Sequence, residues 1–447
     1  MIRALYSLAT WLAQPLLRRK LRRRGVAEPG YLHAVDERFG RYTIQRPDGA
    51  NPLVWIHAVS LGETRAAAIL IDALRVQLPG VRLLLTHGTA TGRAEGQKLL
   101  REGDVQVWQP WDTRGAAQRF LTHFRPDLGV LMETEIWPNL IHEAAARGVP
   151  LALANARLSE KSLRGAQRVD WLMRPAYGAL SAVYAQTEAD AARLAAVGAP
   201  NVAVMGNLKF DAQPDATQQA QAARWRAALR GRPVVLLASA REGEEAQFIE
   251  QIKAPSLAGK ASSAIKNEAG EHAQPLWLIV PRHPQRFDEV AALARAAGLV
   301  VARRSGWTDA PSPDALRGEV WMGDSLGEMA LYYSLADVAL LGGSFAPLGG
   351  QNLIEAAACG CPVVMGPHTF NFAQAAELAE AAGAARRVTD MAEGLAVARQ
   401  LTADAASRQA MGHAGQAFAA LHRGAAQRMA GALVGLLRAR SVLSQVD

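Results

Sequence analysis

The sequence predicts two successive α/β domains, each built on a doubly wound parallel sheet. Short apolar runs alternate with helical stretches along most of the 447 residues, a pattern typical of parallel strands buried on both faces. The alternation breaks in a polar, Gln- and Ala-rich stretch and then starts again. We therefore expect a first Rossmann-like domain over 26–210, a linker over 211–231, a second Rossmann-like domain over 232–425 and a C-terminal helix over 426–447.

The expected strands locate the candidate site segments. They are 53–58, 81–86, 105–108, 128–132, 151–155, 182–185 and 202–205 in the first domain, and 233–239, 276–280, 299–302, 320–322, 338–341 and 363–365 in the second. Ligands of such sheets bind beyond the carboxyl ends of the strands, and we expect the site in a cleft between the two domains. Residues 253–273, rich in Ala, Ser, Gly and Lys, are expected to form a surface loop without a catalytic role.

The N-terminus combines an apolar run with a basic run. Residues 4–17 are mostly apolar, and six Arg or Lys residues follow between 18 and 24. About 14 residues is fewer than the ~20 that a helix needs to cross a bilayer, and a signal peptide carries its charge before the apolar run. We therefore expect residues 1–25 to be an uncleaved anchor on an anionic membrane surface. The alternative is an amphipathic helix that packs on the protein.

Charge and cysteine content restrict the partners. The net charge of +8 favours anionic partners, but no DNA- or RNA-reading motif is present, so we expect no nucleic acid partner. Two cysteines, Cys359 and Cys361, exclude a disulfide framework and suit a reducing compartment. We expect both in the core and expect no metal site.

The segment after the first strand carries Ser60, Gly62 and Glu63 and opens a helix. Gly62 is expected to let the backbone turn closely, and a helix N-terminus favours a carboxylate. Glu63 is therefore either a simple helix-start residue or a general base at the strand end.

Three further segments of the first domain carry polar side chains. Glu133 and Glu135 stand beside Trp137 and can bind sugar hydroxyls, a cation or an arginine; the alternative is an acidic first helical turn. Arg157 suits an anionic substrate or an ordinary surface, and Asn207 and Lys209 form either a site or a plain linker turn.

The second domain repeats this arrangement. Ser239–Glu245 mirrors the first segment and predicts a phosphate or carboxylate seat. Arg282, between two prolines, belongs to a rigid basic loop, and arginine binds phosphate bidentately. The glycine-rich run from Gly342 is expected to cradle a phosphate with bare amides and a helix that opens at Asn352.

In this order and at this spacing, the segments resemble those of the Kdo transferases, inner-membrane enzymes that add 3-deoxy-D-manno-octulosonic acid (Kdo) to the lipid A precursor. The resemblance covers nearly the whole chain: the anchor, His57–Glu63, Glu133–Asn139, Gly206–Asp211, Pro281–Phe287 and Gly349–Glu355. It implies the GT-B fold and inverting transfer of Kdo from CMP-Kdo to lipid IVA at the cytoplasmic face of the inner membrane. It implies no metal and no cofactor other than the donor substrate.

The resemblance also assigns residues. Glu63 would be the catalytic base. CMP would be held by Pro281, Arg282, Leu326, Gly327, Glu328, Asn352, Leu353, Ile354 and Glu355. The expected substrate-binding residues are Ser60, Gly62, Glu135, Arg157, Asn207, Lys209 and Ser239. Arg241 and Gln351 depart from the family pattern, which often has histidine at both positions.

Two other functions are compatible with the sequence. One is a different GT-B enzyme that uses a UDP-sugar and a lipid-linked acceptor. The other is a basic membrane-surface or nucleic-acid-binding protein without catalysis, which the basic run allows. Competition with the donor by UDP rather than by CMP would identify the UDP-sugar enzyme. Salt-dependent binding to nucleic acid would identify the non-catalytic binding protein.

Overall fold

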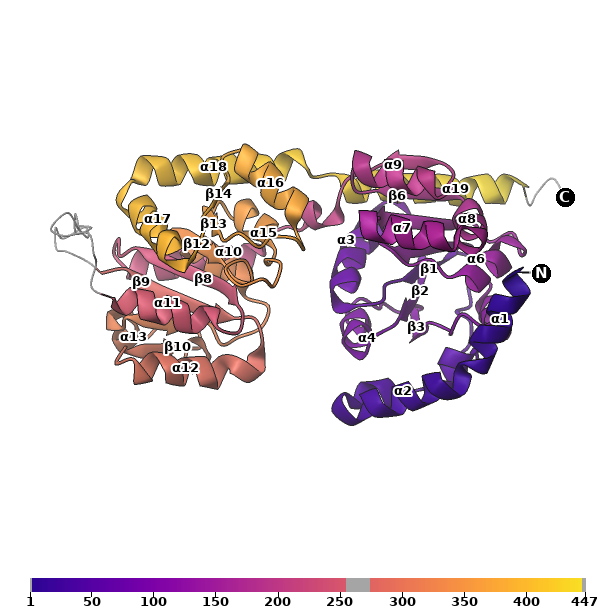
Figure 1. Cartoon of the computed structure of the whole chain (residues 1–447), viewed down its shortest axis with the longest axis horizontal. Coiled ribbons are helices and arrows are strands. Elements are labelled where there is room, and N and C mark those ends of the chain that lie inside the picture. Colours follow the sequence, from indigo (N-terminus) through magenta and orange to yellow (C-terminus); the bar gives the residue numbers. More distant parts are fainter. Residues whose placement is uncertain (1, 255–273, 444–447) are drawn as a thin grey trace. The chain divides into compact units, whose positions relative to one another are not determined.

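The computed structural model describes residues 2–254 and 274–443. The chain divides into two compact units, which we call unit 1 (Met1–Asp211 with His422–Asp447) and unit 2 (Ala212–Leu421). Both are α/β in construction (Figure 1). Residues 255–273, most of the expected surface loop, lie outside the described residues.

The described part of unit 1 is built on a seven-stranded parallel sheet. Its strands lie in the order β3-β2-β1-β4-β5-β6-β7. Their bounds are β1 (Leu53–His57), β2 (Arg82–His87), β3 (Val105–Trp108), β4 (Leu128–Met132), β5 (Leu151–Ala156), β6 (Ala182–Ala185) and β7 (Val202–Val204). The order reverses between β1 and β4, and this switch point is where ligands of doubly wound sheets bind.

Helices cover both faces of this sheet. Successive side chains of β1 point to opposite faces of the sheet, so they belong to two separate cores. Val54 and Ile56 lie in one core, and Leu53 and Trp55 lie in the other. The helices of unit 1 are α1 (Ile2–Leu12), α2 (Gln14–Ala27), α3 (Leu61–Gln77), α4 (Ala90–Gln97), α5 (Arg114–Phe124), α6 (Pro138–Ala145), α7 (Glu160–Arg168), α8 (Asp170–Gly178), α9 (Glu188–Ala196) and α19 (Ala425–Leu443), with short 3-10 turns η1 (Pro29–Leu32), η2 (Val35–Phe39) and η3 (Leu208–Asp211).

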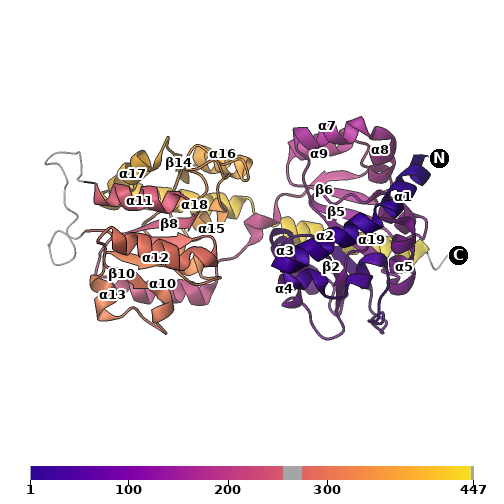
Figure 2. The same ribbon diagram turned by 60° about the horizontal axis from the view of Figure 1, so that its bottom comes forward.

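The C-terminal helix returns to unit 1. Helix α19 packs against α3, and the Asp211 carboxylate accepts the amides of Gly424 and Ala426 at the start of α19. Figures 1 and 2 show α1 running into α2 along one side of the unit. Within the part of the chain that the structure describes, no helix combines the length and apolar character needed to cross a bilayer.

Unit 2 repeats the plan with strand order β10-β11-β9-β8-β12-β13-β14 and a switch point between β8 and β12. The strands are β8 (Val234–Ala240), β9 (Leu276–Pro281), β10 (Val301–Arg303), β11 (Val320–Met322), β12 (Val338–Leu341), β13 (Val363–Met365) and β14 (Ala385–Arg387). The helices are α10 (Ala216–Ala228), α11 (Glu244–Lys253), α12 (Phe287–Ala296), α13 (Pro313–Arg317), α14 (Met329–Leu335), α15 (Leu353–Ala358), α16 (Ala373–Ala381), α17 (Met391–Ala403) and α18 (Ala405–Leu421), with η4 (Pro284–Arg286) and η5 (Arg304–Gly306).

Each expected strand is present, with its bounds shifted by at most a few residues, and the structure adds β14. Strand β14 is a three-residue edge strand that carries Arg386 and Arg387, so its sequence has no apolar run. The expected linker over 211–231 contains α10, which the structure places in unit 2. Trp225 of this helix is buried against the rings of Trp307 and Trp321, and this packing converts a polar Ala- and Gln-rich stretch into part of the unit.

Candidate active site

The carboxyl ends of β1 and β4 bring three carboxylates together at the switch point of unit 1. Glu63 lies in the first turn of α3, directly after β1, while Glu133 and Glu135 follow β4. Since β1 and β4 are neighbouring parallel strands, these segments emerge side by side. The arrangement matches the expected position of a site in a doubly wound sheet.

Glu63 is held by the start of its own helix. The Ser60 hydroxyl caps α3 by accepting the Glu63 amide at 3.4 Å, and it donates to Glu63 Oε1 at 3.2 Å. Glu63 Oε2 accepts the Val59 amide at 2.6 Å. This reciprocal pattern is a form of the capping box, so Glu63 does serve as a helix-start residue.

The same carboxylate has the electrostatic character of a base. Burial raises the pKa of Glu63, and the Val59 hydrogen bond opposes that shift. The charges of Glu135 and Glu133 raise the pKa further, and His57 lowers it. A carboxylate with a raised pKa is a stronger proton acceptor than a solvated one, so the two interpretations of Glu63 are compatible.

Gly62 is not needed for a tight turn, contrary to the prediction. A Cβ at this position would meet only the Ser60 hydroxyl, at 4.0 Å. By contrast, a Cβ at Gly92 would come within 2.9 Å of the Val59 carbonyl oxygen. The position at which the backbone of this loop needs a glycine is therefore Gly92, which packs against the Val59 carbonyl group, whereas the space beside Gly62 is open.

Glu133 and Arg157 form an ion pair next to Glu63. Glu133 is buried, and its Oε2 lies 2.8 Å from Arg157 Nε. Glu133 also has a positive φ of 55°, a left-handed conformation that is costly for a side chain with a Cβ. Strain of this kind concentrates at functional sites, and the positive φ is a property that the sequence did not indicate.

Lys209 adds a second basic group to this cluster, beside Arg157. Burial lowers the pKa of its ammonium group, and the carboxylates of Glu133 and Glu63 oppose that shift. Asn207 accepts the Lys209 amide at 3.0 Å and donates to Gln186 at 3.0 Å. Asn155 accepts the Leu208 amide at 3.1 Å. These side-chain amides hold the turn that carries Lys209.

Glu135 connects the cluster to two rings. Its Oε2 accepts the indole N–H of Trp137 at 3.0 Å and lies 3.7 Å from His57 Nε2. His57 is the last residue of β1 and is fully buried, and its Nδ1 lies 3.0 Å from the Thr86 hydroxyl. His57 was not among the predicted site residues, because a histidine inside an apolar strand gives no sign of its partner.

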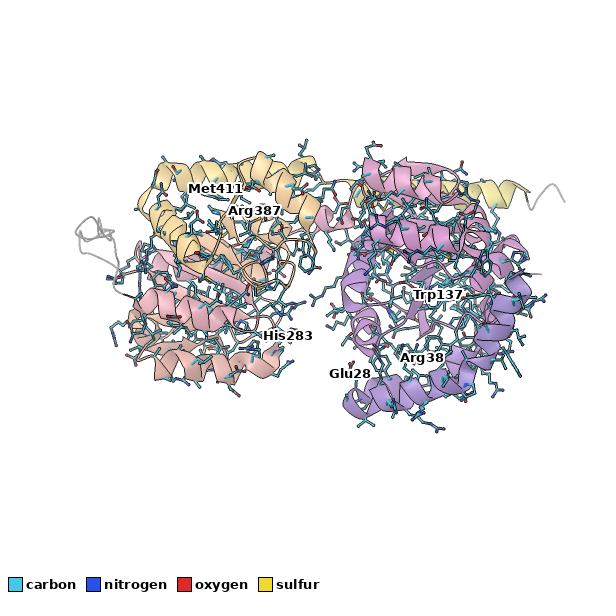
Figure 3. The ribbon with its side chains drawn as sticks, viewed as in Figure 1. Glu28, Arg38, Trp137, His283, Arg387 and Met411 are labelled. Carbon is cyan, nitrogen blue, oxygen red and sulfur yellow. The ribbon has the colours of Figure 1, made fainter. Side chains whose placement is uncertain are left out.

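The first-domain residues predicted to bind substrate thus lie at one edge of unit 1, and Ser239 lies in unit 2. Figure 3 labels Trp137, which follows these residues in unit 1, and His283, which lies in unit 2.

Among the described residues, no three His, Cys, Asp or Glu side chains gather as metal ligands would. Cys361 is buried, as expected for a core residue, whereas Cys359 is only partly buried.

In unit 2, a buried glutamate occupies the amides predicted to cradle a phosphate. Glu244 Oε2 accepts the amides of Arg241 at 2.9 Å and Gly343 at 2.7 Å. Its Oε1 accepts the amides of Phe345 at 3.1 Å and Ala346 at 3.2 Å. The prediction of bare amides in the glycine-rich loop is therefore wrong at these positions, because the protein supplies its own carboxylate.

The predicted donor-binding residues of unit 2 share the carboxyl edge of its sheet. Pro281 ends β9, and the Arg282 amide donates to the Ala240 carbonyl at 2.9 Å. Glu328, at the start of α14, pairs with Arg304 at 2.8 Å. Asn352 caps α15 by accepting the Ile354 amide at 3.1 Å. Leu326, Gly327, Leu353 and Glu355 lie in the same two segments, and α14 packs against α15.

Two parallel-sheet α/β units in succession, with polar side chains beyond the strand ends of each, define the GT-B class to which many glycosyltransferases belong. A solved glycosyltransferase from Rickettsia africae shares this fold, with a TM-score of 0.56 and 10% identity over 87% of this chain and 99% of that one.

Sequence comparisons define the family. A model of the family described as 3-deoxy-D-manno-octulosonic-acid transferase matches residues 33–212. The 3-deoxy-D-manno-octulosonic acid transferase of Bordetella pertussis is 50% identical over 401 residues, covering 89% of this chain and 90% of its own. The transferase of the same name from Haemophilus influenzae is 30% identical over 439 residues, covering 96% and 97%. The chain belongs to the Kdo transferase family, and the resemblance inferred from the sequence segments is confirmed.

Proposed function

We propose that this chain transfers Kdo from CMP-Kdo to the lipid A precursor, lipid IVA, with inversion at the anomeric carbon. The observation that carries the proposal is the 50% identity to a Kdo transferase over 89% of the chain. The cluster of Glu63, Glu133, Glu135 and Lys209 at the switch point of unit 1 supplies residues for the reaction.

The chemistry requires one displacement. Glu63 takes the proton of the acceptor hydroxyl as that oxygen attacks the anomeric carbon of Kdo, and the bond from this carbon to the CMP phosphate oxygen breaks. Negative charge then develops on the phosphate, where the guanidinium of Arg282 and helix N-termini stabilise it. Lys209 and Arg157 provide positive charge for anionic groups of the substrates. No step needs a metal ion or a further cofactor.

Product analysis tests this function. Purified chain, CMP-Kdo and lipid IVA are expected to give a product heavier by one or more Kdo residues in mass spectrometry. CMP is also expected to raise the unfolding temperature and to compete with the donor, because a ligand that binds only the folded protein stabilises it. Protection and competition by UDP in place of CMP would show a UDP-sugar enzyme instead. Salt-dependent binding to nucleic acid without either effect would show a non-catalytic binding protein.

We further propose that α1 and α2 lie on the cytoplasmic face of the inner membrane. The outer side of α1 and the start of α2 carry Leu5, Leu8, Trp11, Leu12 and Leu16, each between 52% and 69% exposed. Contiguous exposed apolar side chains of this kind mark interaction surfaces. Arg19, Lys20, Arg22 and Arg23 are exposed beside them and suit anionic headgroups.

Replacing Leu8 and Trp11 by Asp is expected to lower binding to anionic phospholipid vesicles at least tenfold, since a buried side chain of this size contributes about 1.5–3 kcal/mol. Vesicle sedimentation measures the effect. Val76→Asp is the matched control, because Val76 on α3 is 72% exposed and far from α1 in sequence. Unchanged vesicle binding by the double variant would contradict the membrane role.

A further inference from the structure

The inner side of α1 is joined to unit 1 by polar side chains. The Tyr6 hydroxyl donates to Asp112 Oδ2 at 2.8 Å, and the Ser7 hydroxyl donates to Asn139 Oδ1 at 2.8 Å. Arg3 lines a cavity of about 70 Å³ together with Pro138 of α6 and Trp171 of α8. A helix that served only as a membrane anchor would not need these contacts. Helix α1 therefore also forms part of the packed structure of unit 1.

Asp112 is the centre of this connection. It is buried, and its carboxylate accepts the amides of Asn139 at 3.1 Å and Leu140 at 2.8 Å, which are the first amides of α6. The Asn139 side chain donates in turn to the Asp112 carbonyl at 2.8 Å. The start of α6 is therefore held directly by Asp112 and, through Ser7 and Tyr6, by α1.

Helix α6 follows directly on the loop that carries Glu133 and Glu135. Trp137 precedes its first residue, and the Trp137 indole donates to Glu135 at 3.0 Å. Glu135 lies 3.7 Å from His57, and its charge is one of those that act on Glu63. A continuous series of hydrogen bonds and close contacts thus leads from α1 through α6 and Trp137 to Glu135, beside the base.

We propose that Tyr6 and Ser7 are positioning residues, through which the N-terminal helix holds the start of α6 and so fixes Glu135 and Trp137 beside Glu63. This inference rests on the proposed function, because it assigns the cluster of unit 1 to the transfer reaction. The helix α1 then has two roles on opposite sides: its apolar side meets lipid, and its polar side sets the geometry of the site.

The test separates positioning from tethering by removing the need for a tether. The full-length Tyr6→Phe/Ser7→Ala variant is assayed with CMP-Kdo and detergent-dispersed lipid IVA at saturating concentrations. We expect kcat to fall about tenfold, because small misplacements of reacting groups are costly, while KM for the acceptor and vesicle binding stay within about threefold of wild type.

The pH profile supplies a second readout. Glu63 is surrounded by Glu133 and Glu135 from the end of β4, by His57 from β1 and by Lys209 after β7. The charge of Glu135 raises the pKa of Glu63, so a displaced Glu135 is expected to move the acid limb of the pH–rate profile to lower pH.

Two variants on the same helix act as controls. Thr10→Ala removes a hydroxyl that donates only within α1, to the Ser7 carbonyl at 3.0 Å, and is expected to leave both readouts unchanged. Ser7→Thr, combined with the native Tyr6, keeps the hydroxyl and is expected to be as active as wild type. A lower unfolding temperature with unchanged kcat and pH profile would show a purely structural contact and overturn the proposal. Unchanged kcat and stability would also overturn it. Absence of Kdo transfer by the wild-type chain would instead reject the proposed function.

Discussion

Glu63→Gln is expected to lower kcat for Kdo transfer by about 10²–10⁴-fold, the range that a positioned general base contributes. The amide keeps the shape of the side chain, and its oxygen can still accept the Val59 amide that Glu63 accepts at 2.6 Å. It has no basic site for the acceptor proton. CMP protection against unfolding is expected to persist, because the predicted donor residues belong to unit 2.

The raised pKa of Glu63 predicts how both the activity and the stability of the protein depend on pH. Activity is expected to fall as pH decreases through that raised pKa, above the ordinary value of 4.5, because only the ionised group accepts a proton. The folded chain holds the Glu63 proton more tightly than the unfolded chain does. Ionisation of Glu63 therefore lowers the free energy of unfolding as pH rises from 4.5 through the raised pKa. The uncharged variant is expected to unfold at neutral pH at a temperature equal to or above that of wild type.

Glu95→Gln is the matched control for this experiment. Glu95 is another helical glutamate of unit 1, and it pairs on the surface with Arg65 at 3.4 Å and Lys98 at 2.6 Å. Exposed pairs of this kind contribute little, so its activity and stability are expected to match wild type. Normal turnover by a folded Glu63→Gln variant would exclude Glu63 as the base. A large loss of stability together with the loss of activity would favour the helix-capping role alone.

Glu244→Gln is expected to lower the free energy of unfolding by about 2–6 kcal/mol, the cost of leaving two buried amides without an acceptor at about 1–3 kcal/mol each. Glu244 is fully buried, and each of its carboxylate oxygens accepts two backbone amides. An amide group replaces one oxygen by an N–H donor, so two of the four amides lose their acceptor in either orientation. Denaturant unfolding measures the effect.

The loop that Glu244 holds runs from Gly343 to Ala346, next to the switch point of unit 2. A weaker protection by CMP is therefore expected to accompany the loss of stability. Glu242→Gln is the control: the half-exposed carboxylate of Glu242 pairs with Arg241, and its loss is expected to change the free energy of unfolding by less than about 0.5 kcal/mol. Equal stability of the Glu244→Gln and Glu242→Gln variants would show that the buried carboxylate is not needed.

The sheet plan was accessible from the sequence because buried parallel strands have a distinctive composition. Val54, Ile56 and their neighbours are apolar on both faces of β1, and short, continuous apolar runs between helical stretches are typical of parallel strands buried on both faces. The arginines of β14 carry no such signal, since an edge strand needs burial on fewer sides. The helix α10 was missed for a related reason, because only two of its residues, Ala222 and Trp225, are buried and the rest of the stretch is polar or small.

The candidate site was accessible only in part. The position of Glu63 after a strand and at a helix start is a local property, and so is the succession of Glu135, Arg157 and Lys209 at later strand ends. Their common edge follows from the parallel sheet. The partner of each group is not local: His57 meets Glu135 across two strands, and Glu244 meets Gly343 about 100 residues away in the chain.

The sequence by itself determined the two α/β units, the order of their strand-end segments and membership of the Kdo transferase family, because each depends on residue type and spacing along the chain. The tertiary structure decided which amides are occupied, which carboxylates are buried together and that the polar side of α1 is joined to α6. These properties arise from contacts between residues far apart in sequence, and burial and neighbouring charge, rather than residue type, set the basicity of Glu63.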